Sequence, residues 1–254
     1  MSGVVTRWGA GSHPGLRRDV NEDSALTAPG LLVVADGMGG HRHGDLASAA
    51  VVRAFESLAG RADLTRADVE ATIASAHRDV AELGAGVAEG VGSTLAGVAL
   101  VGVEGGAEWL VFNVGDSRVY RHRHGLLEQF SVDHVATSRA EPGAPPRSLL
   151  TRAVGMEAVF ESAWAADYRA AAVVAGDRWL VCSDGLTKEL SDPVIAAVLG
   201  DSDDPQAAAD ALIERALAAG GRDNVTVAVL DVVGDDGGAL PEEDTLVASR
   251  RDPA

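Results

Sequence analysis

Cysteine is nearly absent from this sequence, whose 254 residues contain only Cys182. A single thiol excludes an internal disulfide and a zinc site built from several cysteines, and it suits a reducing compartment. Long hydrophobic runs are also missing: no stretch reaches the ~20 apolar residues of a membrane-spanning helix, and the N-terminus has no apolar core of signal-peptide length. The sequence therefore predicts a soluble, cytoplasmic protein with no membrane partner.

Basic residues are scarce as well. Lysine and arginine together number 21 against 38 acidic residues, which gives a net charge of −17. This charge argues against a nucleic-acid partner and against docking on anionic lipid. The hydrophobic content of 46% is typical of a globular protein and excludes wholesale disorder. The chain is long enough to bury a sizeable core within one large domain.

Short apolar runs dominate the chain and predict strands. They lie at residues 31–35, 95–103, 108–114, 118–121, 126–130, 178–182 and 225–232. Glycine-containing turns join two pairs of them into predicted hairpins. Helical patterns open at four points, Asp45, Thr65, Asp192 and Asp204. Hairpin-linked strands with paired helices do not fit regular βαβ alternation, and they favour antiparallel sheets with helices layered on them.

Aspartates stand at the ends of the predicted strands. Asp36 and Asp184 each follow an apolar run closely, Asp223 precedes the last run, and Asp116 lies between two others. Carboxylates gathered on rigid elements repel one another unless a cation compensates, and hard oxygen ligands select Mg²⁺ or Mn²⁺ over zinc. Any one of these residues alone is better explained as part of a turn. Together, the four predict a metal site.

A few other residues could take part in chemistry at such a site. Arg18 precedes Glu22 in the sequence, and the fork of a guanidinium matches phosphate oxygens. His41 follows the glycine run after Asp36 and is a candidate general acid, with His43 and His134 as alternatives. No serine stands in a G-x-S-x-G nucleophile elbow.

Eight ordered motifs make the pattern specific. They are Arg18-Asp19-Val20-Asn21-Glu22-Asp23, Val34-Ala35-Asp36-Gly37-Met38-Gly39-Gly40-His41, Gly92-Ser93-Thr94, Asn113-Val114-Gly115-Asp116-Ser117-Arg118, Asp133-His134, Leu150-Thr151-Arg152-Ala153-Val154-Gly155, Cys182-Ser183-Asp184-Gly185-Leu186-Thr187 and Gly221-Arg222-Asp223-Asn224-Val225-Thr226-Val227. The chain resembles the metal-dependent serine/threonine protein phosphatases of type 2C in their bacterial form. The resemblance runs from about residue 5 to 233 and implies one catalytic domain over 1–233, followed by an acidic tail, 234–254, expected to be disordered.

The resemblance implies an α+β fold, a four-layer αββα sandwich of two antiparallel β-sheets flanked by helices, with a metal centre at one end. Its cofactors would be two Mn²⁺ or Mg²⁺ ions, with room for a third. By motif match, Asp36 would bridge both ions and the Gly37 carbonyl would bind one of them. The other implied roles are Asp184 and Asp223 as ligands of the second ion, Glu22 and Asp23 acting through waters, Asp116 at the third ion, Asn224 behind the ligands and Arg18 on phosphate.

The activity implied by the resemblance is hydrolysis of phosphoserine and phosphothreonine in proteins by a metal-bridging hydroxide. His41 is the candidate proton donor to the leaving alkoxide, and the enzyme would act as a monomer opposing a serine/threonine kinase. One departure keeps alternatives open, because the flap at 135–149 is short and proline-rich. A catalytically silent phosphoprotein-binding regulator and a hydrolase of small phosphometabolites are the other two hypotheses.

Overall fold

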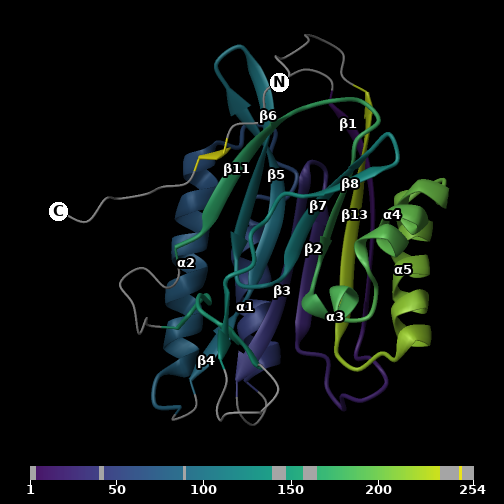
Figure 1. Cartoon of the computed structure of the whole chain (residues 1–254). Coiled ribbons are helices and arrows are strands. Elements are labelled where there is room, and N and C mark those ends of the chain that lie inside the picture. Colours follow the sequence, from purple (N-terminus) through teal and green to yellow (C-terminus); the bar gives the residue numbers. More distant parts are fainter. Residues whose placement is uncertain are drawn as a thin grey trace.

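Two antiparallel β-sheets lie face to face in the computed structural model, with helices on both outer faces (Figure 1). The structure describes residues 4–39, 43–87, 90–138, 147–156, 165–234 and 246–247. The first sheet has the strand order β1-β13-β12-β7-β8. Its strands are β1 (Val5–His13), β7 (Arg118–Arg123), β8 (Leu126–Gln129), β12 (Arg178–Cys182) and β13 (Val225–Gly234).

The second sheet has the order β14-β11-β6-β5-β3-β2, with β4 paired to β3. Its strands are β2 (Asp23–Ala28), β3 (Leu31–Gly39), β4 (Val91–Ser93), β5 (Leu95–Val103), β6 (Gly106–Val114), β11 (Asp167–Ala172) and β14 (Leu246–Val247). A separate two-stranded unit pairs β9 (Val135–Ser138) with β10 (Arg147–Leu150). The helices are α1 (Gly44–Glu56), α2 (Arg66–Gly84), α3 (Asp184–Thr187), α4 (Asp192–Asp201) and α5 (Pro205–Ala219).

Strand β3 shows how the layers are held together. Successive side chains of a strand point to opposite faces. Leu31 and Val33 therefore enter the core beneath α1 and α2, whereas Leu32 and Val34 enter the core between the sheets. A strand that faces an apolar core on both sides favours apolar residues at every position, which accounts for the uninterrupted hydrophobic run at 31–35.

The other helical layer packs on the first sheet in the same way. Val227 and Val229 of β13 face the core beneath α4 and α5, while Ala228 and Leu230 face the other sheet. Between the sheets, Trp179 of β12 has its ring centroid 6.0 Å from that of Trp109 and 5.0 Å from that of Phe130. The four layers confirm the predicted αββα sandwich.

Local signals in the sequence account for most elements. Both predicted hairpins form, β5–β6 through Gly105 and β7–β8 through His124-Gly125, all three with positive φ. Helix α2 begins with the capping box of Thr65 and Asp68. Strands β1, β2, β4, β9, β10, β11 and β14 were not predicted, because they are short or interrupted by polar residues and glycine. None of the helices described here is long and apolar enough to cross a membrane.

Two predictions about the chain's organisation fall partly outside the described residues. Of the flap at 135–149, the structure describes the antiparallel strands β9 and β10 but not residues 139–146. Of the tail at 234–254, it describes Gly234 and the pairing of β14 with β11. The predicted disorder of the tail stays a prediction.

The core between the sheets can be tested by a single truncation. Leu32 is fully buried there, so Leu32→Ala is expected to lower the free energy of unfolding by about 2–5 kcal/mol through lost burial and a cavity. Urea unfolding followed by circular dichroism measures this change. Leu126→Ala is the matched control, because Leu126 is 76% exposed. Equal effects of the two substitutions would contradict the assigned core.

Candidate metal centre

Acidic side chains converge at one end of the sandwich. Asp36 lies near the end of β3, Asp184 is the first residue of α3 after β12, and Asp223 stands just before β13. They line one cavity of about 320 Å³. The same cavity is lined by the other predicted site residues Arg18, Glu22, Gly37 and Asp116, and by Lys188. Asp23 lies beside it, paired with Asp36 across strands β2 and β3.

The backbone around Asp36 is fixed by Ser93 and Thr94, where β4 ends and β5 is about to begin. The Asp36 N–H donates to Thr94 Oγ1 at 2.9 Å, and the Asp36 carbonyl accepts from the Thr94 N–H at 2.8 Å. Ser93 Oγ also donates to the Asp36 carbonyl at 3.1 Å. Thr94 Oγ1 then shares a hydrogen bond of 2.7 Å with Ser117 Oγ. This chain of contacts ties the end of β3 to the turn that carries Asp116.

Gly37 lies where β3 meets the start of α1. A Cβ at this position would overlap the carbonyl of Gly44, so no larger residue fits there. The Gly37 N–H donates to the Glu22 carbonyl at 3.0 Å, and the Glu22 N–H donates to Asn224 Oδ1 at 2.9 Å. Asn224 Nδ2 donates to the Val20 carbonyl at 2.9 Å. Asn224 therefore joins the segment before β2 to the Asp223 loop.

The turn between β6 and β7 presents Asp116, and His134 holds that turn. Gly115 has φ of 105°, and its N–H donates to His134 Nδ1 at 3.1 Å. Because Nδ1 accepts, the neutral ring carries its proton on Nε2, which lies 3.0 Å from Asp167 Oδ2. His134 is buried and does not line the cavity. The structure thus gives it a supporting position and not that of a general acid.

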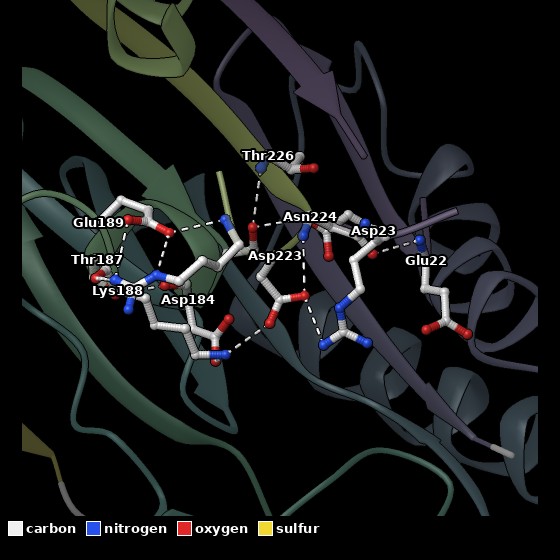
Figure 2. Close-up of polar contacts among 12 residues, drawn as sticks. Glu22, Asp23, Asp184, Thr187, Lys188, Glu189, Asp223, Asn224 and Thr226 are labelled. Atoms are coloured by element: carbon white, nitrogen blue, oxygen red, sulfur yellow. Dashed lines mark hydrogen bonds and ion pairs between the residues drawn. The ribbon is translucent and has the colours of Figure 1, made fainter. Parts of the chain in front are cut away.

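Two basic side chains reach the acidic cluster. Arg18 Nη2 lies 2.9 Å from Asp223 Oδ1. Lys188 Nζ lies 2.5 Å from Asp184 Oδ2 and 3.0 Å from Asp223 Oδ2. Figure 2 shows Lys188, Asp184 and Asp223 together, with Asn224 and Glu22 on the far side of Asp223. Lys188 was not predicted as a site residue, although it lies four residues after Asp184 and is the chain's only lysine.

Burial and mutual repulsion raise the pKa values of most of these carboxyl groups. Burial, followed by the charges of Asp23 and Asp184, raises the pKa of Asp36 well above its ordinary value. Burial also raises the pKa of Asp23 and of Asp116 to about 6. Asp223 differs, because Lys188 and Arg18 outweigh its burial and lower its pKa. Arg18 and Lys188 therefore supply less positive charge than the clustered carboxylates need.

The donor set fits a hard divalent cation. Asp23 Oδ1 and Asp184 Oδ1 are buried and have no hydrogen-bond partner among the described residues, whereas buried polar atoms are normally paired. Oxygen donors of this kind are those that Mg²⁺ and Mn²⁺ prefer. Within the described ranges, no three acidic, histidine or cysteine side chains are already arranged to hold an ion. Binding therefore requires side-chain rearrangement.

The other two histidine candidates, His41 and His43, follow the glycine run after Asp36. His41 lies outside the described residues, so its assignment as proton donor stays a prediction. His43 is the N-cap residue of α1 and has its Cβ close to Gly39, which lines the cavity.

Comparison with known proteins decides the family. The family model described as protein phosphatase 2C matches residues 17–212. The chain belongs to the protein phosphatase 2C family. This confirms the resemblance found in the sequence and accounts for the sandwich fold.

Similar proteins in the protein phosphatase 2C family come from bacteria. Serine/threonine protein phosphatase PstP of Mycobacterium tuberculosis is 38% identical over 248 residues, covering 91% of this chain and 46% of PstP. The chain thus spans about half the length of this curated relative. A crystal structure of the Mycobacterium tuberculosis phosphatase PstP/Ppp superposes with a TM-score of 0.78 and 34% identity, covering 91% of this chain and all of that one.

A second structure bears on the cofactor. It is the PstP catalytic domain in complex with two manganese ions, with a TM-score of 0.73 and 35% identity, covering 91% of this chain and all of that one.

The raised pKa of Asp116 predicts a pH-dependent cost to stability. Its folded-state pKa of about 6 lies above the ordinary value, so the folded protein gains stability as the pH falls from about 7 towards 4. At pH 7.5 the free energy of unfolding of Asp116→Asn is expected to exceed that of the wild type by about 0.5–2 kcal/mol. Near pH 4 the two proteins are expected to be equally stable.

Urea unfolding of the metal-free protein in EDTA measures this difference at both pH values. Asp63→Asn is the control, because the Asp63 side chain is 80% exposed and beside Arg61. A variant at Asp116 no more stable than the wild type at pH 7.5 would refute the argument.

Proposed function

We propose that this chain is a metal-dependent phosphatase that hydrolyses phosphoserine and phosphothreonine in proteins. The observation that carries the proposal is the convergence of acidic side chains and Arg18 on one cavity, in a chain of the protein phosphatase 2C family. The manganese-bound PstP domain supports a cofactor of two divalent cations, Mn²⁺ or Mg²⁺.

The proposal gives each group in the cavity a task. Asp36, the Gly37 carbonyl, Asp184 and Asp223 would hold the cation pair, with Glu22, Asp23 and Asp116 around it. When bound, such cations activate water as a nucleophile and neutralise charge on the transferring phosphoryl group.

Arg18 is placed to bind the phosphate. Its side chain is half exposed at the cavity, with Nη2 on Asp223. A guanidinium can donate two parallel hydrogen bonds to phosphate oxygens, and it stabilises charge that develops on those oxygens during transfer. The leaving serine or threonine oxygen needs a proton, and His41 remains the candidate donor.

The partners follow from the same proposal. The substrates are proteins that have been phosphorylated by a serine/threonine kinase, and the phosphatase opposes that kinase. We infer that the enzyme has no nucleic-acid or membrane partner, since a net charge of −17 repels polyanions and anionic lipid. A monomeric state and a cytoplasmic location belong to the same proposal.

Removal of the carboxylate at Asp36 tests the chemistry. Asp36→Asn is expected to lower Mn²⁺-dependent phosphate release from a phosphothreonine peptide by more than about 100-fold, because even residues that only orient metal ligands cost 10–100-fold. Asp63→Asn, an exposed change of the same kind, is expected to retain activity. Equal rates for wild type and Asp36→Asn would refute the proposal, and a preference for small phosphometabolites over phosphopeptides would refute the substrate class.

Arg18 can be tested against its neighbour. Arg18→Ala is expected to lower kcat/KM for the phosphopeptide by about 10-fold or more, the usual value of a hydrogen bond to a charged group. Arg17→Ala is the matched control, because Arg17 is exposed and does not line the cavity. Steady-state kinetics measures both, and similar losses in the two variants would remove Arg18 from phosphate binding.

A further inference from the structure

Lys188 is the only lysine of the chain, and it lies in the acidic cavity. The chain contains 21 basic residues, of which 20 are arginine and one is lysine. That lysine lines the acidic cavity. Elsewhere on this protein, positive charge is supplied by guanidinium groups, so the cavity holds its only ammonium side chain.

The fold directs this ammonium group to two carboxylates from separate segments. The Lys188 N–H donates to the Asp184 carbonyl at 2.8 Å, which places the two side chains one helical turn apart. Nζ lies 2.5 Å from Asp184 Oδ2 and reaches Asp223 Oδ2, before β13, at 3.0 Å. The backbone of Lys188 is held as well, because Arg222 Nη2 donates to the Lys188 carbonyl at 3.1 Å.

Lys188 occupies only one oxygen of each carboxylate in the Asp184–Asp223 pair. Asp223 has its second oxygen occupied by Arg18 at 2.9 Å and the Asn224 N–H at 3.0 Å. Asp184 keeps Oδ1 buried and without a partner in the described part of the chain. A cation shared by Asp184 and Asp223 would therefore compete with the ammonium group for the same oxygens.

The ammonium group of a lysine can leave a carboxylate pair more easily than a guanidinium group can. An ammonium is a point charge on a flexible four-carbon stem, whereas a guanidinium binds a carboxylate in a fixed, two-pronged geometry. The Lys188 side chain is half exposed, so it has an open path into solvent when it leaves. A divalent cation carries twice its charge and gains correspondingly more from the two carboxylates.

We propose that Lys188 is a tethered cation that occupies the Asp184–Asp223 pair until a divalent cation displaces it, and that it thereby lowers the affinity of one of the two cation sites. The inference rests on the proposed function, because it assumes that Asp184 and Asp223 bind the cation. Lys188 acts through these ligands and is a positioning residue.

Calorimetric titration with Mn²⁺ tests the competition. Lys188→Met removes the charge and keeps the length of the side chain, and it is expected to tighten the weaker Mn²⁺ site by about 10-fold. Arg215→Met is the matched control, since it brings the same change of charge at an exposed position on α5. An unchanged or weaker Mn²⁺ affinity in Lys188→Met would overturn the proposal.

Amine labelling tests the displacement in the wild-type protein, so it does not depend on the folding of a variant. Lys188 is the only side-chain amine, and its acetylation by a dilute anhydride can be followed by peptide mass spectrometry. Saturating Mn²⁺ is expected to increase the labelling rate several-fold, relative to free N-acetyl-lysine in the same solution. An unchanged or slower rate would show that the ammonium stays on the carboxylates and would overturn the proposal.

The two proposals fail separately. A wild-type protein that binds no Mn²⁺ in the calorimeter would contradict the proposed function itself. A wild-type protein that binds Mn²⁺ and releases phosphate, with Lys188→Met showing the same affinity, would contradict only the role of Lys188.

Discussion

Repulsion among carboxylates is the constraint on which this structure depends. Burial, followed by the charges of neighbouring aspartates such as Asp184, raises the pKa values of Asp23, Asp36 and Asp116. Such a cluster destabilises the fold unless positive charge compensates its negative charge. Arg18 and Lys188 supply part of that positive charge from within the chain. The negative charge that they leave uncompensated makes the cavity suited to divalent cations.

The sandwich supplies the rigidity that this repulsion requires. Strands β3, β12 and β13 are packed by core residues on both faces. The acidic residues at or beside their ends meet around one cavity at the same end of the sandwich. Connections between the segments are polar and specific. Thr94 joins Asp36 to the Asp116 turn, and Asn224 joins the Asp223 loop to Glu22. The acids are thus held near one another by contacts that do not involve their own charges.

Sequence patterns predicted the parts of the molecule whose cause is local. Doubly buried strands give apolar runs, uninterrupted at 31–35 and broken only by Thr226 and Asp231 at 225–232. The aspartates beside these runs were recognised as a site. Strand β1 escaped prediction for a tertiary reason: Gly9 lies so close to the backbone of Gln206 in α5 that a Cβ would overlap it, and an apolar side chain is excluded there. The turn-holding ring of His134 and the contact of Lys188 with Asp223 likewise depend on distant segments, which no local pattern encodes. The pairing of Lys188 with Asp184, four residues earlier, is a local pattern that was overlooked.

The central claim is that the cavity between β3, α3 and the Asp223 loop holds a pair of divalent cations. A crystal structure with Mn²⁺, using anomalous scattering from manganese, tests it most directly. The account predicts two anomalous peaks inside this cavity, with oxygens of Asp36, Asp184 and Asp223 as ligands. Anomalous density confined to other parts of the surface, with these carboxylates still bound only to Lys188 and Arg18, would contradict it.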